Sequence, residues 1–471
     1  MKPVSILLLA GWCVALPAAA EDLAGVFDTA LKTDPTIQQA GYQHQGARET
    51  RLQARLNMVP VSATANKSWS GVQGGPTTSG QAAATLGLNV NLLSWNSWIN
   101  LKSANAQTAQ SDANYIAAQQ DLVARVTSAY FAVLAAKDTL ISQEGALASA
   151  TRQLEQAQRR FEVGLIANTD VQIAQAQRDS SEADVISARR SVASAEEALR
   201  AITGQKYGVL AAPRNDMPLL SPDPASEDAW VSAALRQNAG LNAARLAEDI
   251  AHDGYLSAFG GHLPNVSLGA QRNWAIGGTS NTSTASSALP PINTTDITWT
   301  ASVSVPLFTA GATQSQVRAA RYSWDAARAS AERTLRSTEQ SARDAYQGVI
   351  SQIAQVNSLR QAVASSRASL AAVEAGYEVG TKTALDVLTS RSQLVSAQTR
   401  YASAKYGYLN NIVALRLAAG QLDVETVKLI NGWLSENASD TTIVSPAQEP
   451  AAITPPAAPA PPAPPAATTA Q

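Results

Sequence analysis

Apolar residues recur at a seven-residue spacing along two long stretches of the chain. In the first stretch they are Val126, Val133, Leu140, Leu147, Leu154 and Phe161. In the second half the same spacing returns at Ala342, Val349, Val356, Val363, Leu370 and Tyr377. A heptad spacing of apolar side chains is typical of long helices that supercoil around a neighbour.

Both stretches are free of the residue that most strongly interrupts a helix. No proline occurs between Pro76 and Pro213, or between Pro306 and Pro446. The pattern therefore predicts a helix over about 98–161, which would span roughly 95 Å at 1.5 Å per residue. A second helix, nearly as long, is expected over about 313–377. Return helices are expected over about 170–202 and 386–417.

Four shorter segments alternate apolar and polar residues, which is the two-residue period of a β-strand. The clearest has Ile297, Trp299, Ala301, Val303 and Val305 on one side and threonines and serines between them. A second alternates Leu86, Leu88, Val90 and Leu92 with small polar residues, and two weaker segments follow Pro60 and Pro264. These segments predict β-hairpins at about 60–93 and 264–307.

The order of elements is therefore the same in both halves, which indicates a duplicated half-protein rather than a short repeat. We predict a first repeat over 21–212 with its long helical hairpin at about 98–203, and a linker over 213–225. A second repeat is expected over 226–420 with its helical hairpin at about 313–419. An equatorial segment is expected over 421–440 and a disordered Pro/Ala-rich tail over 441–471.

The two helical hairpins turn at matching motifs. Phe161-Glu162-Val163-Gly164 is followed by Asp170-Val171, and Tyr377-Glu378-Val379-Gly380 by Asp386-Val387. The glycines fit helix C-caps. Each aspartate fits the first turn of the next helix, where the helix dipole stabilises a carboxylate, and Thr383-x-x-Asp386 resembles a capping box. Tyr377 continues the heptad series, so core packing is its simplest role.

The N-terminus has the features of a cleaved secretory signal over residues 1–20. Lys2 supplies the positive charge, an apolar stretch follows, and Ala18-Ala19-Ala20 precedes Glu21. The single cysteine, Cys13, lies inside this signal behind Trp12, so neither a lipid anchor nor a disulfide is expected in the mature chain. The net charge of −2 does not favour nucleic acid as a partner.

Four strands cannot close a sheet on themselves, and an open sheet leaves two unpaired edges. A transmembrane β-barrel has at least eight strands. Three copies of the chain would supply twelve strands and, beside them, a tube of long helices. The expected fold class is therefore mostly α with β: a trimeric 12-stranded β-barrel continued by an α-helical barrel that projects into the periplasm.

The residues resemble those of the TolC-type outer-membrane efflux proteins over nearly all of 21–421. The motifs that carry the resemblance are Asp34-Pro35, Arg160-Phe161-Glu162-Val163-Gly164, Ala198-Leu199-Arg200-Ala201-Ile202-Thr203-Gly204, Gly376-Tyr377-Glu378-Val379-Gly380-Thr381 and Tyr406-Gly407-Tyr408-Leu409-Asn410. The resemblance implies a homotrimer in the outer membrane, in contact with its lipid. It also implies a periplasmic adaptor (membrane fusion protein) and an inner-membrane pump or ABC transporter as partners.

The same resemblance implies roles for residues at the hairpin turns. Entrance-gate contacts would involve Thr169, Asp170, Tyr377 and Lys382, and the pore constriction a ring of Asp386. An arginine stands where this chain has Lys382 in one well-characterised member; lysine lacks the bidentate fork, so a looser clasp is expected. Thr389 occupies the position of a second aspartate ring, which implies a weaker negative constriction. Gly164 and Gly380 would lie where an adaptor contacts the hairpin tips.

The function expected from these features is a passive exit duct for efflux or type I secretion, gated at its periplasmic tip. A periplasmic coiled-coil spacer or adaptor without a pore is the alternative, although it has no use for the four alternating strands. Nothing in the sequence indicates an enzyme or a cofactor. His44, His252 and His262 are scattered without the spacing of a metal site.

Overall fold

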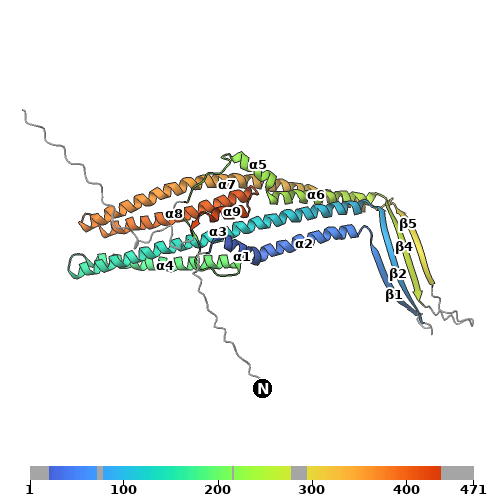
Figure 1. Ribbon diagram of the computed structural model, residues 1–471, viewed down its shortest axis with the longest axis horizontal. Coiled ribbons are helices and arrows are strands. Elements are labelled where there is room, and N and C mark those ends of the chain that lie inside the picture. The colour runs from blue at the N-terminus through green and yellow to red at the C-terminus, as the bar shows by residue number, and fades with distance from the viewer. Residues whose placement is uncertain (1–20, 72–77, 215–216, 277–293, 436–471) are drawn as a thin grey trace, which may run out of the picture. The chain divides into compact units, whose positions relative to one another are not determined.

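The computed structural model describes residues 21–71, 78–214, 217–276 and 294–435 (Figure 1). The expected signal over 1–20 and the expected tail over 441–471 lie outside these residues. The described part of the first repeat comprises α1 (Leu23–Thr33), α2 (Pro35–Leu56), β1 (Val61–Gly71), β2 (Thr78–Leu93), α3 (Trp95–Glu162) and α4 (Asn168–Thr203).

The second repeat follows the same order after a short strand. Its elements are β3 (Ala212–Pro213), α5 (Glu227–Gln237), α6 (Ala239–Phe259), the 3-10 turn η1 (Gly260–His262), β4 (Asn265–Ile276), β5 (Thr294–Ser304), α7 (Ala312–Glu378) and α8 (Ala384–Ala418). The chain then adds α9 (Val424–Asn431) and β6 (Leu434–Ser435). The duplicated pairing of a β-hairpin with a long helical hairpin, expected from the two periodicities, is confirmed. No described helix combines the length and the apolar character needed to cross a membrane.

The long strands form one antiparallel sheet in the order β1-β2-β4-β5, so the two hairpins join through β2 and β4 (Figure 1). The register places Val61, Leu88, Ala270 and Trp299 in one row across the sheet. The next row on the same face contains Ala63, Leu86, Arg272 and Ile297, with the Arg272 guanidinium 5.1 Å from the centre of the Trp274 ring. One face of the sheet is thus largely apolar.

The opposite face of the sheet is polar. Thr85 donates a hydrogen bond to Asn273 across the β2–β4 pair at 3.0 Å. The hydroxyls of Ser267 and Ser302 lie 2.7 Å apart across the β4–β5 pair. Apolar side chains on the first face remain open to solvent in the single chain, with Trp299 72% and Val303 69% exposed. The strand alternation seen in the sequence therefore sorts the residues onto two chemically different faces.

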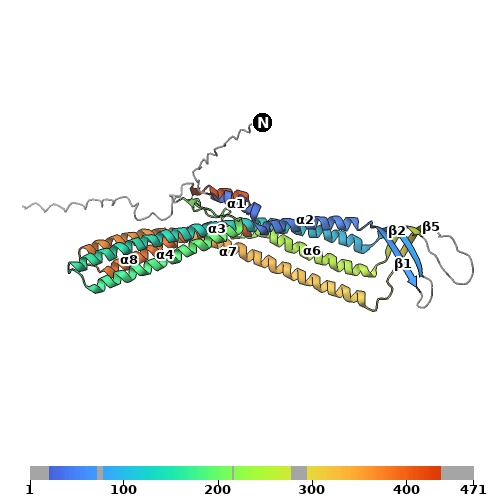
Figure 2. The same ribbon diagram turned by 90° about the horizontal axis from the view of Figure 1, so that it is seen from below.

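The chain folds into two compact units, and each draws residues from both repeats. Unit 1 comprises the described residues within 21–135, 193–362 and 403–435, and includes the sheet. In the described residues, unit 2 comprises Ala136–Val192 and Val363–Ala402, which are the ends of the helical hairpins α3–α4 and α7–α8 (Figure 2).

The core of unit 1 lies where the short elements pack on the long helices. Tyr130 on α3 is fully buried, and its hydroxyl donates to the carbonyl of Ala211 at 2.7 Å. Burial raises the pKa of the Tyr130 hydroxyl, so it remains a neutral donor. Tyr408 on α8 is also buried, and its hydroxyl accepts a hydrogen bond from the backbone N–H of Leu220 at 2.7 Å. These buried tyrosines tie the connecting segments to the long helices.

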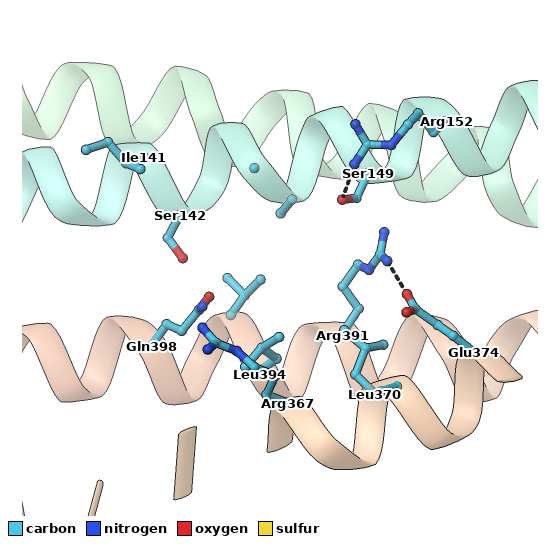
Figure 3. Close-up of a pocket in the computed structure, with 14 residues that line it drawn as sticks. Ile141, Ser142, Ser149, Arg152, Arg367, Leu370, Glu374, Arg391, Leu394 and Gln398 are labelled. Atoms are coloured by element: carbon cyan, nitrogen blue, oxygen red, sulfur yellow. Dashed lines mark hydrogen bonds and ion pairs between the residues drawn. The ribbon is translucent and has the colours of Figure 1, made fainter. Parts of the chain in front are cut away.

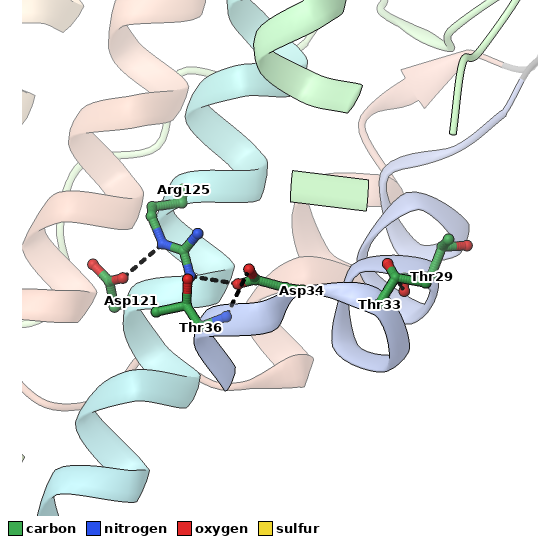
Figure 4. A network of polar contacts seen from close by, with 6 residues as sticks. All are labelled: Thr29, Thr33, Asp34, Thr36, Asp121 and Arg125. Carbon is green, nitrogen blue, oxygen red and sulfur yellow. Dashed lines mark hydrogen bonds and ion pairs between the residues drawn. The ribbon is translucent and has the colours of Figure 1, made fainter. Parts of the chain in front are cut away.

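An ion pair between the buried Asp34 and the partly exposed Arg125 holds the junction of α1 and α2 against α3 (Figure 4). Asp34 caps α2 by accepting from the backbone N–H of Thr36 at 3.1 Å, and Pro35 follows at the first helical position. The Arg125 guanidinium binds the Asp34 carboxylate at 2.6 Å and the exposed Asp121 carboxylate at 2.7 Å. Burial opposes ionisation of Asp34, but hydrogen bonds from Arg125 and Thr36 hold its pKa below the ordinary value.

Candidate functional site

The residues singled out by the sequence lie at the two hairpin turns of unit 2. In the first turn, Gly164 adopts φ = +75°, a conformation that an L side chain disfavours. The backbone N–H of Gly164 bonds to the carbonyl of Phe161 at 2.9 Å, and that of Leu165 to Arg160 at 2.8 Å. The second bond joins the first and last of six consecutive residues, which is characteristic of a Schellman C-cap. Gly164 therefore ends α3, as the motif predicts.

The second turn ends α7 in a related way. Gly380 has φ = +80°, and the carbonyl of Gly376 accepts from the backbone N–H groups of Thr381 and Lys382 at 2.9 and 3.2 Å. The Thr381 hydroxyl donates to the same carbonyl at 3.0 Å. The Lys382 side chain lies close over Gly376, where an added Cβ would meet its Cγ at 2.7 Å. This packing places the only lysine of the two turns directly beside the start of α8.

Asp386 and Thr383 form the capping box that their spacing suggests. The Thr383 hydroxyl accepts from the backbone N–H of Asp386 at 3.2 Å. The Asp386 carboxylate accepts from the backbone N–H and the hydroxyl of Thr383, each at 2.9 Å. The backbone hydrogen bond, then the hydroxyl, then the charge of Lys382 lower the pKa of Asp386. Asp386 therefore stays ionised at neutral pH while capping α8.

Asp170 and Thr169 lie in the first turn of α4, where Asp170 is half-buried and Thr169 is exposed. The backbone N–H of Asp170 bonds to the carbonyl of Ala167 at 3.1 Å. Among the described residues of this single chain, no hydrogen bond or ion pair joins the Asp170 carboxylate to Tyr377 or Lys382. The gate contacts expected from the resemblance thus stay a prediction.

Tyr377 instead has a neighbour that the sequence did not reveal. The Arg160 guanidinium lies 5.0 Å from the centre of the Tyr377 ring, in a cation–π arrangement. The contact joins α3 to α7, and each of the two hairpins contributes one residue from near its tip. Leu154, Ala157 and Ala174 form a small buried cluster beneath the first turn, with Ile166 and Val171 packed against it. The contact of Arg160 with Tyr377 therefore links the two hairpins of unit 2.

An ion pair of Arg391 and Glu374 joins α8 to α7 and was also missed. A signal for it was present in the sequence, because the two residues are nearly equidistant from the turn at Thr381 and Lys382. Residues placed in this way face each other across an antiparallel helical hairpin. Thr389, one turn after Asp386, donates its hydroxyl to the Leu385 carbonyl at 2.9 Å and adds no charge.

In the described residues, the histidines do not cluster with other side chains that could bind a metal ion. His44 on α2 bonds to Asp112 on α3 at 2.6 Å and stacks on Tyr115. His252 lies against Trp324, with 4.6 Å between ring centres. Within the ranges the structure describes, no group of three or more His, Cys, Asp or Glu side chains is arranged to hold a metal ion.

Comparison with known proteins places these features in a family. The sequence model described as "Outer membrane efflux protein" matches residues 26–205 and 230–421. The outer membrane protein TolC of Vibrio cholerae is 35% identical over 88% of this chain and 94% of its own length. The alkaline protease secretion protein AprF of Pseudomonas aeruginosa is 28% identical over 86% of this chain and 85% of its own length.

The fold agrees with solved structures as well. The crystal structure of the outer membrane protein VceC from Vibrio cholerae superposes with a TM-score of 0.71 at 21% identity. The match covers 84% of this chain and 96% of that one. The mostly helical fold class with a small antiparallel sheet is therefore confirmed.

Proposed function

The chain belongs to the outer membrane efflux protein family, and we propose on that basis that it is a passive exit duct across the outer membrane and the periplasm. The location in the outer membrane and the role in efflux or type I secretion agree with its relatives, one of which is named as a secretion protein. The names of these relatives refer to the outer membrane and to secretion, and none of them names an enzymatic activity of its own.

The observation that carries the proposal is the two-faced sheet. Its exposed apolar face, with Ile297 at 62% and Trp299 at 72% exposed, suits contact with lipid hydrocarbon. Its polar face, with Ser267, Thr85 and Asn273, suits a water-filled interior. A coiled-coil spacer without a pore would leave the apolar face uncovered in water, at an unfavourable free energy.

Three copies of the chain complete the duct. The sheet order leaves β1 and β5 as edge strands, and each can pair with the opposite edge of another copy. Repeating that contact around a threefold axis joins the three sheets into one closed sheet of twelve strands. The long helices of three copies would then surround one aqueous tunnel in the periplasm.

The entrance of this tunnel lies at the hairpin turns. Asp170, Tyr377 and Lys382, with Thr169, hold the closed entrance through contacts that form in the trimer. Each copy contributes one Asp386 to a ring at the constriction, where its lowered pKa keeps it charged. Because Thr389 adds no second carboxylate, the ring carries a modest negative charge.

In this proposal the duct is passive, and the energy for transport comes from its partners. An inner-membrane pump or ABC transporter would supply cargo through a periplasmic adaptor. The adaptor contacts the hairpin tips at Gly164 and Gly380, whose exposed backbone leaves room for a close approach. The tunnel opens when the contacts of the adaptor with the hairpin tips displace the gate residues.

Conductance in planar lipid bilayers tests the proposal. The purified wild-type protein should insert as a trimer and give small, stable channels. Asp170→Ala combined with Lys382→Ala should raise single-channel conductance, because the entrance loses its clasp. The matched control removes an exposed ion pair of the same unit, Glu144→Ala with Arg189→Ala, and should leave conductance unchanged.

Two results would contradict different parts of the proposal. An elongated monomer that stays in solution and never inserts would exclude the duct. Trimeric channels whose conductance is the same in the Asp170 and Lys382 double variant would keep the duct and exclude the clasp.

A further inference from the structure

The two helical hairpins of unit 2 meet at a cavity of about 490 Å³ close to their turns. Its walls come from the segment 149–160 of α3, from the segment 374–378 of α7, and from Val387 and Arg391 of α8. Because side chains in a well-packed interior interdigitate with few voids, a cavity marks a place where two elements share few contacts. The contacts beside it therefore decide how firmly the hairpins stay together near their tips.

Each hairpin has contacts of its own that hold its two helices together. In the first hairpin, Leu154 and Ala157 of α3 and Ala174 of α4 form the buried cluster beneath the turn. In the second, the Arg391 guanidinium of α8 reaches the Glu374 carboxylate of α7 (Figure 3). Both sets of contacts stay intact when one hairpin moves away from the other. The α7–α8 pair can therefore separate from α3 as one body.

A contact between the hairpins lies at the cavity itself. Arg160 and Tyr377 both line it, and the Arg160 guanidinium lies 5.0 Å from the centre of the Tyr377 ring. Among the described residues, no ion pair engages Arg160. Arg152, on the same wall, instead donates to the Ser149 hydroxyl of its own helix at 3.2 Å (Figure 3). Arg160 thus directs its positive charge to the other hairpin, whereas Arg152 does not.

The backbone on both sides of this contact is fixed by the helix caps. The Arg160 carbonyl accepts the hydrogen bond from Leu165, at 2.8 Å, that ends α3. The carbonyl of Gly376, next to Tyr377, accepts from the backbone N–H of Thr381 at 2.9 Å and so ends α7. The cation–π contact therefore joins one capped turn to the other, and a displacement of either tip reaches it within one turn of helix.

We propose that Arg160 is a positioning residue of the tunnel entrance, which holds the Tyr377 ring, and with it the α7–α8 hairpin, against α3 until a tip is displaced. The inference rests on the proposed function, because it assigns Arg160 a part in the gating of the duct. Arg160 contacts the face of the ring, whereas a bond to Asp170 would use the hydroxyl at the ring edge. One partly exposed cation–π contact changes an equilibrium by roughly twofold to fivefold. Three of them, in a trimer that opens as a whole, change it by roughly tenfold to a hundredfold.

Single-channel recording of the full-length trimer in planar lipid bilayers tests the proposal, through the ratio of time spent in the high- and low-conductance states. Arg160→Gln should raise this ratio by roughly tenfold to a hundredfold. Arg160→Lys keeps a cation without the planar guanidinium and should give a ratio between those of the wild type and Arg160→Gln. Arg159→Gln is the matched control. It removes the same charge from the same cavity at the adjacent, exposed position and should leave the ratio unchanged.

Variants of Tyr377 show whether Arg160 acts through the ring. In Tyr377→Phe, which keeps the ring and loses the hydroxyl, the added Arg160→Gln change should still raise the ratio. In Tyr377→Leu, which has no ring, the same change should have no further effect, because the two residues form one contact. An equal effect of Arg160→Gln in both backgrounds would show that Arg160 acts by another route and would overturn the proposal.

The remaining outcomes separate the role of Arg160 from the duct. Wild-type channels with an unchanged ratio in Arg160→Gln would overturn the role of Arg160 and leave the duct standing. An equal rise in Arg159→Gln would also overturn it, because the charge near the entrance, and not this contact, would then control opening. Absence of any channel in the wild type would contradict the duct itself and the role of Arg160 with it.

Discussion

The Asp34–Arg125 pair should control how firmly the α1–α2 junction stays docked on α3. Arg125→Met removes the guanidinium and leaves the Asp34 carboxylate, which is 2% exposed, without its ionic partner. Breaking a buried pair commonly costs about 3–5 kcal/mol. Two features reduce that figure here: Asp34 keeps its bond from Thr36, and Arg125 is 32% exposed. We therefore expect a loss of about 2–3 kcal/mol in local stability.

Hydrogen exchange followed by mass spectrometry measures this loss directly. At pH 7 the amides of residues 30–34 and 36–38 should exchange roughly 30- to 150-fold faster in Arg125→Met; they include the N–H of Asp34, which bonds to the carbonyl of Ala30 at 2.8 Å. The matched control is Asp121→Ala, which removes the other carboxylate on Arg125. Asp121 is 57% exposed, so its loss should cost only about 0–1 kcal/mol.

The effect should also depend on pH in one direction. The folded-state pKa of Asp34 lies below its ordinary value of 3.8, so its stabilisation is fully present above that value. It disappears as the pH falls through the lower, folded pKa. The gap between wild type and Arg125→Met should therefore shrink in acid. Equal exchange in both proteins at pH 7, or an equally large effect of Asp121→Ala, would refute the reasoning.

Three further predictions concern the hairpin turns. Thr383→Ala should raise the pKa of Asp386 towards its ordinary value, because the hydroxyl donor is lost; a carboxyl-carbon NMR titration checks this, and an unmoved midpoint would contradict it. Arg160→Gln should cost about 0.5–1 kcal/mol by removing the cation–π contact with Tyr377, seen as faster exchange at both tips, whereas Arg159→Gln should have no such effect. Gly380→Ala should lower the free energy of unfolding by about 1 kcal/mol, because φ at this position is +80°. Gly46→Ala, in open space on α2, should be neutral or stabilising, and the same response at both sites would argue against a strained turn.

Local features of the site were predictable because they depend on neighbours in sequence. Gly380 ends α7 because the backbone there is left-handed, a conformation that glycine adopts without strain. Thr383 and Asp386 cap α8 through hydrogen bonds between residues only three apart. The partner of Tyr377 was not predictable in the same way, whereas the pairing of Arg391 with Glu374 could have been expected from their similar distances to the hairpin turn. Arg160 meets Tyr377 from another helix far away in sequence, and no local spacing specifies that contact.

The amino-acid sequence by itself determined the long helices, the alternating strands, the duplication and the helix-ending turns, because periodicity and capping act over a few residues. The tertiary structure alone decided that β2 pairs with β4, which joins the two repeats into one sheet. It also decided that Arg160 on α3 meets the ring of Tyr377 on α7. Such arrangements arise from packing between segments that are distant along the chain, where burial and charge in three dimensions choose among many possible neighbours.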